Sequence, residues 1–235
     1  MTERSIAIIG DGKMGQAIRQ LAVDNGWKVA AFIGESDSAG GSGINAKTLG
    51  KADVAVEFTQ PDAAVANITA SLRAGVPIVA GTTGWYDALP EVTRIAKETG
   101  TGFLWSPNFS LGINVMIELA RYAGTLMRTL EGFDAHIVET HHTRKKDAPS
   151  GTAIALGKAA TDTLDRPIPT TSIRTGSVPG THELIFDGSF EQLSLNHVAR
   201  DRRVFAEGAL QAAGWLIGKK GVFTMRDVLN LPARK

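Results

Sequence analysis

The chain has 235 residues, of which 43% are hydrophobic and 21% charged, a composition typical of a globular protein with one large or two smaller domains. Its formal net charge of +1 excludes an overall field that would attract nucleic acid or an anionic membrane surface. Because cysteine is absent, disulfides, thiolate nucleophiles and cysteine-ligated zinc are excluded, and we predict no metal site.

The N-terminal residues indicate the compartment. Met1 to Arg4 lead directly into a short apolar segment without the long apolar region of a signal peptide. No stretch approaches the roughly 18 apolar residues of a membrane span. We therefore expect a soluble, cytoplasmic protein that binds neither membrane nor nucleic acid.

Short apolar runs alternate with segments of helical periodicity through the first hundred residues. Runs at 6–9, 29–33, 54–58, 78–80 and 103–105 are typical of buried parallel strands. Helices are predicted at 14–25, 63–74 and 89–99, and Gly26, Gly75 and Gly100 each follow one, where a left-handed C-cap lies. This alternation predicts a Rossmann-type α/β fold with a doubly wound parallel sheet.

The pattern changes after Pro107. A helix is predicted at 111–130, a strand at 135–140, a helix at 151–164 and strands at 171–174, 182–186 and 193–198. Short links between these strands favour an α+β domain with a mixed or antiparallel sheet. Helical segments at 205–217 and 223–229 could pack back on the first domain. We therefore predict a dinucleotide-binding domain of residues 1–109 with 204–235, and a second domain of residues 110–203.

A glycine motif lies between the first predicted strand and the first predicted helix. Such a GxGxxG turn brings a pyrophosphate against the backbone N–H groups of a helix N-terminus. The alternative is a glycine-rich turn without a ligand. The candidate cofactor-binding residues are Gly10, Asp11, Gly12, Lys13, Met14 and Gly15.

The cofactor also needs a partner for its adenosine ribose, usually an acidic residue about 20 positions further on. Glu35 has this spacing and Asp37 is near, but both lie in a Ser/Gly-rich segment, 34–43, where either could simply be solvated. Of the cations near this segment, Lys28 precedes the strand at 29–33 and so lies at its opposite end, and the next cation along the chain is Lys47. Without an obvious cation for a 2′-phosphate, the sequence favours NADH with tolerance for NADPH.

Two further loops follow predicted parallel strands, and ligands bind outside the carboxyl ends of such strands. Small hydroxyl and amide residues there can border a nicotinamide, although ordinary turns have the same composition. The candidates are Gly81, Thr82 and Thr83 in one loop and Ser106, Pro107, Asn108 and Phe109 in the other.

The segment 139–153 combines two histidines, three cations and a helix start. Imidazoles exchange protons near neutral pH, and the free N–H groups of a helix N-terminus attract anions. This predicts an anion site, with a solvated basic loop as the alternative. Its members are Glu139, His141, His142, Arg144, Lys145, Lys146, Asp147, Ser150, Gly151 and Thr152.

Taken with the glycine motif and the Gly81 and Ser106 loops, this segment resembles the signature of the 4-hydroxy-tetrahydrodipicolinate reductase (dihydrodipicolinate reductase) family over essentially the whole chain. The resemblance implies NADH- or NADPH-dependent reduction of a cyclic dicarboxylate to tetrahydrodipicolinate in lysine and diaminopimelate biosynthesis. It also implies that the second domain binds substrate and forms a homotetramer. By resemblance, His141 is the proton donor/acceptor and Lys145 the proton donor, while His142, Ser150, Gly151 and Thr152 bind substrate.

Other charged residues of this segment keep alternative interpretations. Glu139 could orient a histidine or do nothing chemical, Asp147 could position Lys145, and Arg144 and Lys146 are expected to be solvated. No catalytic role is assigned to the remaining histidines, His136, His182 and His197.

Two other functions are compatible with the sequence. One is a dinucleotide-sensing regulatory protein of the same fold. The other is a different two-domain amino-acid dehydrogenase, against which the 139–153 segment argues.

Overall fold

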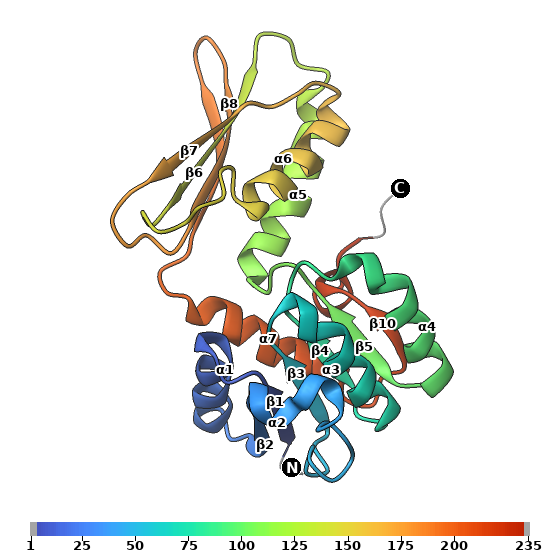
Figure 1. Cartoon of the computed structure of the whole chain (residues 1–235). Helices are drawn as coiled ribbons and strands as arrows, with labels where there is room; N and C mark the ends of the chain where they lie inside the picture. The colour runs from blue at the N-terminus through green and yellow to red at the C-terminus, as the bar shows by residue number, and fades with distance from the viewer. Residues whose placement is uncertain (1–3, 233–235) are drawn as a thin grey trace. The chain divides into compact units, whose positions relative to one another are not determined.

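The computed structural model describes residues 4–232, and the chain divides into two compact units. The first contains residues up to Phe109 and from Phe205 onward, and the second runs from Ser110 to Val204. Figure 1 shows a parallel sheet with helices in the first unit and a separate sheet with two long helices in the second. The predicted fold class is thereby confirmed.

A six-stranded parallel sheet forms the centre of the first unit, in the order β10-β5-β4-β3-β1-β2. Since β2 lies on one side of β1 and β3 on the other, the strand order reverses there, which is where open α/β sheets bind ligands. The strands are β1 (Ser5–Ile9), β2 (Lys28–Ile33), β3 (Val54–Glu57), β4 (Ile78–Ala80), β5 (Gly102–Trp105) and β10 (Gly221–Phe223). The helices are α1 (Lys13–Asp24), α2 (Glu35–Ser38), η1 (Ala39–Gly41), α3 (Pro61–Arg73), η2 (Tyr86–Ala88), α4 (Leu89–Thr99), α7 (Arg203–Leu216) and α8 (Met225–Val228).

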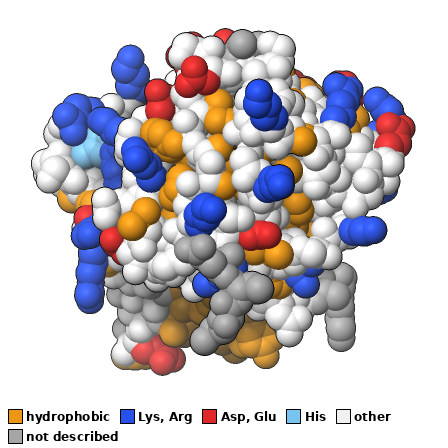
Figure 2. Space-filling model, turned by 90° about the horizontal axis from the view of Figure 1, so that it is seen from below, with side chains coloured by type: hydrophobic (Ala, Val, Ile, Leu, Met, Phe, Trp, Pro, Cys, Tyr) orange, Lys and Arg blue, Asp and Glu red, His pale blue; other side chains and the backbone are white. Residues whose placement is uncertain are grey.

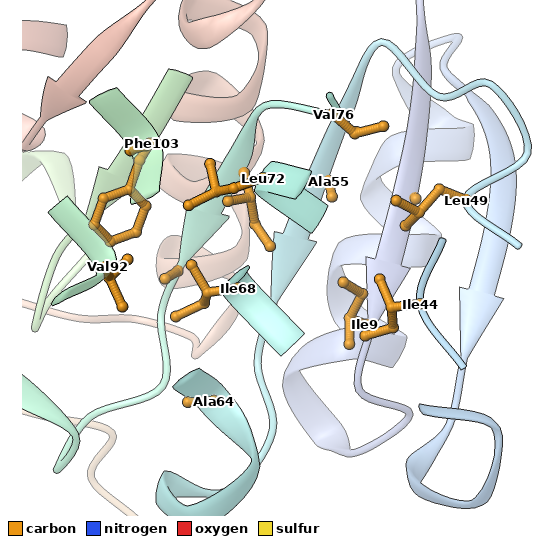
Figure 3. Close-up of a cluster of buried hydrophobic side chains, with 14 of the residues drawn as sticks. Ile9, Ile44, Leu49, Ala55, Ala64, Ile68, Leu72, Val76, Val92 and Phe103 are labelled. Carbon is orange, nitrogen blue, oxygen red and sulfur yellow. The ribbon is translucent and has the colours of Figure 1, made fainter. Parts of the chain in front are cut away.

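The core of the first unit explains why its central strands are apolar throughout. Every residue of β3 and β4 is buried, as in a parallel sheet covered on both faces. Ile68 and Leu72 of α3 pack with Val92 of α4 and Phe103 of β5, while Ile44 lies beside β1 (Figure 3). Each such buried side chain contributes about 1.5–3 kcal/mol to stability.

Three helices of the first unit end just before a glycine, as the sequence predicted. Gly26, Gly75 and Gly100 have φ of 72°, 76° and 62°, so the predicted left-handed positions are confirmed. The prediction of one helix over 223–229 was wrong at its start. Phe223 ends the short strand β10, and α8 begins at Met225 behind a capping box formed by Thr224 and Asp227.

The second unit has a four-stranded mixed sheet in the order β7-β6-β8-β9. Its strands are β6 (Asp134–His141), β7 (Thr170–Arg174), β8 (Thr181–Asp187) and β9 (Gln192–Val198), and only β6 and β7 are parallel. Helices α5 (Leu111–Met127) and α6 (Gly151–Leu164) pack on one face through Met116 and Leu156, against Ile137 and Phe186 of the sheet. The predicted helix over 111–130 is three residues too long, since α5 ends at Met127.

Charged side chains of both signs are spread over the face seen in Figure 2, with small groups of hydrophobic side chains between them. Among the residues that the structure describes, no helix combines the length and the hydrophobicity required to cross a bilayer.

Candidate active site

The glycine loop after β1 is shaped by close backbone contacts. A Cβ at Gly10 would lie 2.1 Å from the carbonyl oxygen of Phe58, and one at Gly15 would lie 1.8 Å from that of Gly10. A Cβ at Gly12 would meet nothing within 4 Å. The first and third glycines therefore let the loop fold, whereas Gly12 leaves open space in front of α1, as approach of a pyrophosphate requires.

The N-terminus of α1 is itself suited to an anion. The helix begins at Lys13 with Gly12 as N-cap, no side chain caps it, and its first turn contains no acidic residue. Its first N–H groups and the positive end of its dipole are thus available to a phosphate.

A cleft of about 880 Å³ lies in front of this loop. It is bordered by the segments that follow β1, β3 and β4, the neighbouring strands at the switch point. Of the predicted residues it includes Gly10, Asp11, Gly12, Lys13, Met14, Glu35, Gly81, Thr82 and Thr83. Lining residues that the sequence did not suggest include Ser38, Phe58, Thr59, Gln60 and Asp62.

The other predicted cofactor-binding residues lie outside the lining of the cleft. Ser106 is buried and its hydroxyl donates to the carbonyl of Asn108 at 2.7 Å, while the Phe109 ring packs 5.7 Å from that of Phe58, which lines the cleft. Gly15 supports the loop. Among the described residues, Gly15, Ser106, Pro107, Asn108 and Phe109 do not line the cleft.

A buried carboxyl group, Glu57, joins two loops of the cleft. Its Oε1 accepts hydrogen bonds from the Thr82 hydroxyl at 2.8 Å, the Thr59 N–H at 3.0 Å and the Thr59 hydroxyl. Burial raises the pKa of Glu57, although these hydrogen bonds act in the opposite direction. An acidic residue at the end of an apolar strand was the sequence signal for this contact.

In the second unit, β6 ends at His141, whose buried ring contacts Glu139 two residues earlier. Nδ1 of His141 hydrogen-bonds Oε2 of Glu139, and Oε1 accepts from Nη2 of Arg174 at 2.7 Å. Glu139 and His141 point to the same face because side chains alternate along a strand, and Arg174 pairs with His141 in the parallel register of β6 and β7. Three residues from two strands thus form one hydrogen-bonded chain, in which Glu139 and His141 are buried.

A second histidine lies beside this chain. The His182 ring of β8 stands edge-on to the His141 ring, with centroids 5.1 Å apart, and its Nε2 is 3.2 Å from the Ser150 hydroxyl. Ser150 is the N-cap of α6 and also accepts from the N–H of Ala153 at 3.2 Å. The cluster therefore reaches from the strand to the helix start.

The protonation states of this cluster follow from burial and hydrogen bonding. Burial alone would raise the pKa of Glu139, but hydrogen bonds from Arg174, Ser172 and His141 lower it to about 2. Burial lowers the pKa of His141, partly offset by Glu139, and burial with the neighbouring His141 lowers the pKa of His182 to about 4. Near neutral pH, Glu139 is ionised and His182 is neutral.

The same three side chains are the one group in the described chain with the spacing of metal ligands. Ligand atoms of Glu139, His141 and His182 lie within 4.8 Å of one another. Both carboxylate oxygens of Glu139, however, already accept hydrogen bonds from Arg174 and His141.

The loop after β6 holds the other predicted residues. His142 accepts a hydrogen bond at Nε2 from Nη2 of Arg202 at 2.7 Å, so its neutral form carries the proton on Nδ1. The Lys145 ammonium pairs with Asp147 at 2.9 Å, and Gly151 is exposed as the first residue of α6. Arg144 and Lys146 are exposed, as expected for solvated flanks.

Comparison with known proteins identifies the family. The family model "Dihydrodipicolinate reductase, N-terminus" matches residues 4–109, and "Dihydrodipicolinate reductase, C-terminus" matches residues 112–229. The chain belongs to the dihydrodipicolinate reductase family.

Relatives of this family match over nearly their whole length. A protein of Christiangramia forsetii named 4-hydroxy-tetrahydrodipicolinate reductase is 36% identical, with 96% of this chain and 98% of that protein covered. One of the same name from Xanthomonas euvesicatoria pv. vesicatoria is 38% identical, covering 97% and 100%. A solved structure of dipicolinate-bound dihydrodipicolinate reductase from Paenisporosarcina sp. TG-14 has a TM-score of 0.81 at 24% identity, covering 96% and 99%, and shows the shared fold.

The contacts of Glu139 and Asp147 agree with one of the roles considered for each from the sequence, orienting a histidine and positioning Lys145, whereas His182 was assigned no role. Glu139 contacts His141, Asp147 contacts Lys145, and His182 contacts Ser150. Arg174 was not singled out at all. Its position beside His141 depends on strand pairing, for which the local sequence gave no signal.

Proposed function

We propose that the protein reduces 4-hydroxy-tetrahydrodipicolinate, by way of dihydrodipicolinate, to tetrahydrodipicolinate with a nicotinamide dinucleotide. This is the step named for the relatives that match nearly the whole chain. The observation that carries the proposal is the buried pair of Glu139 and His141 beside the N-terminus of α6. The pair offers a titratable imidazole next to a site for a carboxylate.

The glycine loop and α1 would hold the dinucleotide pyrophosphate, and Gly81, Thr82 and Thr83 would border the nicotinamide. The space in front of Gly12 and the uncapped start of α1 support this fit. When bound, the cofactor supplies a hydride. Glu57 contributes by holding the Thr59 and Thr82 loops together.

His141 is suited to exchange the proton that accompanies reduction. Its Nδ1–H is donated to the ionised Glu139, which leaves Nε2 to accept or release a proton. Because hydride addition pushes electrons toward the ring nitrogen of the substrate, a proton delivered at that side offsets the developing charge. Lys145 is the second donor, positioned by Asp147.

The start of α6 would hold a substrate carboxylate. Ser150 caps the helix, and a Cβ at Gly151 would meet nothing within 4 Å, so the first turn is open to a ligand. Thr152 adds a hydroxyl in the same turn. His142 would be a further substrate contact, held by its hydrogen bond with Arg202.

We also propose a cytoplasmic homotetramer built through the second unit. Ile173 and Val198 lie on the sheet face opposite α5 and α6 and are 42% and 57% exposed. Exposed hydrophobic side chains on such a face support association. Light scattering of the purified protein tests the tetramer.

The proposed reaction is tested by adding freshly generated substrate and following the oxidation of NADH and of NADPH in separate reactions. We expect substrate-dependent oxidation with both, and faster oxidation of NADH. Dinucleotide binding without turnover would contradict the proposal and favour a sensor.

A further inference from the structure

The end of β2 lacks the side chain that dinucleotide-binding sheets commonly place there. β2 ends at Ile33, and the next residue, where an acidic side chain often binds the adenosine ribose, is Gly34. A Cβ at Gly34 would lie 2.7 Å from Oδ2 of Asp11 and 3.2 Å from its Cγ. The Asp11 carboxylate therefore occupies the space in which a side chain at position 34 would begin.

The backbone places Asp11 next to the end of β2. β1 and β2 are paired in parallel up to Ile9 and Ile33, and the N–H of Gly10 donates to the carbonyl of Ile33 at 2.8 Å. The first turn of the glycine loop is thereby fastened to the end of β2. Asp11 is exposed and lines the cleft beside that end.

We propose that Asp11, rather than Glu35, binds the adenosine ribose and makes the cleft prefer NADH to NADPH. The inference rests on the proposed function, because it requires that the cleft holds a nicotinamide dinucleotide. A carboxylate accepts hydrogen bonds from ribose hydroxyls, whereas it repels the added negative charge of a 2′-phosphate.

The other charged residues of the cleft do not replace Asp11. Glu35 lines the cleft from the exposed start of α2, one residue beyond Gly34, and Asp62 lines it from α3. Lys13 is a cation at the start of α1, where the pyrophosphate of either cofactor is expected. Apart from the chain neighbours of Gly34, the three atoms nearest to a Cβ at that position all belong to Asp11.

Equilibrium binding tests the inference without turnover. NADH and NADPH are titrated separately, by nucleotide fluorescence, into wild type, Asp11→Asn and Glu35→Gln. For Asp11→Asn we expect weaker NADH binding, tighter NADPH binding and a change in the ratio of the two dissociation constants of on the order of tenfold. Glu35→Gln should change this ratio less than about twofold.

Asp37→Asn is the matched control. It removes one carboxylate from α2 at an exposed residue outside the cleft lining, so the ratio should stay at the wild-type value. Competition by 5′-AMP and adenosine 2′,5′-bisphosphate then locates the effect. Only competition by the bisphosphate should strengthen in Asp11→Asn.

Three results would overturn the inference. An unchanged ratio in Asp11→Asn, or a larger change in Glu35→Gln, would overturn it while leaving the proposed function intact. Failure of the wild type to bind either dinucleotide would overturn both. Because Asp11 is exposed and Asn has nearly the same shape, thermal melting should show a folded variant.

Discussion

The cleft of the first unit is formed mainly by backbone groups, whereas the histidine cluster of the second unit is formed by side chains. The cleft depends on backbone, since Gly10 and Gly15 permit its turn and Gly12 leaves the start of α1 open. The cluster depends on side chains, since Glu139 and His141 are buried and joined by hydrogen bonds.

Because of this difference, the two regions should respond differently to added side-chain volume, to changes of charge and to pH. A site made of N–H groups is insensitive to pH and is blocked by added volume. A buried site made of ionised side chains is sensitive to charge and pH, because an unpaired charge there is costly. Substitutions should therefore affect dinucleotide affinity in one unit and turnover or acid stability in the other.

The largest expected effect is on turnover in Lys145→Ala. Loss of a proton donor lowers turnover by about 10²- to 10³-fold, while dinucleotide affinity stays nearly unchanged because Lys145 belongs to the second unit. Lys146→Ala removes an exposed neighbouring ammonium and should keep wild-type turnover. Steady-state kinetics compare the two, and equal losses in both variants would refute a specific role for Lys145.

The second largest effect is expected on the stability of the protein at low pH, through Glu139 of the side-chain cluster. The pKa of Glu139 falls from 4.5 to about 2 on folding, which corresponds to about 3 kcal/mol of stability. Because the folded pKa is the lower one, this stabilisation is present above pH 4.5 and is lost as the pH falls toward 2. Urea unfolding should show that Glu139→Gln loses this pH-dependent part.

Glu183→Gln is the control for that measurement. Glu183 lies on β8 with its side chain on the opposite face of the sheet, so its removal should leave the acid dependence near that of the wild type. Identical acid profiles for Glu139→Gln and the wild type would contradict the assigned ion pair.

Dinucleotide affinity should respond to volume at Gly12. Gly12→Val places a side chain in the open space before α1 and should weaken NADH binding at least roughly tenfold. Thermal melting should remain near the wild type, since the added atoms meet no protein atom at the Cβ position. Unchanged fluorescence titration with NADH would place the pyrophosphate elsewhere.

The smallest effect is expected from the helix caps. Ser150→Ala and Ser110→Ala each remove an N-cap hydroxyl, from α6 and α5, and should each cost about 1 kcal/mol of stability. Only Ser150→Ala should also raise KM for the substrate, since only α6 is assigned to the substrate carboxylate. Equal KM values in both variants would argue against that assignment.

Local patterns predicted the elements that have a clear apolar run or a cap, but they missed the strand β10. The strand at Ile78–Ala80 and the helix at Leu89–Thr99 match their predicted bounds, because apolar runs and helix caps are formed by residues that are close in sequence. β10 is three residues long and shows no period of its own, so the prediction of a helix over 223–229 absorbed Phe223. Its place in the sheet depends on pairing with β5.

The candidate site was predictable only where its residues are close in sequence. His141 and His142 are consecutive, yet they have different partners, Glu139 and Arg202, because β6 ends at His141 and His142 begins the loop that follows. His182 and Arg174 reach the cluster from β8 and β7. Their approach is set by strand register, for which nothing in the 139–153 segment is a signal.

The most direct test is to measure turnover and NADH affinity together in His141→Gln. Proton transfer is assigned to the side-chain cluster of the second unit, and dinucleotide binding to the backbone cleft of the first. We therefore expect turnover about 10²- to 10³-fold below wild type, with a dissociation constant for NADH nearly unchanged. Wild-type turnover, or a parallel loss of NADH affinity, would contradict it.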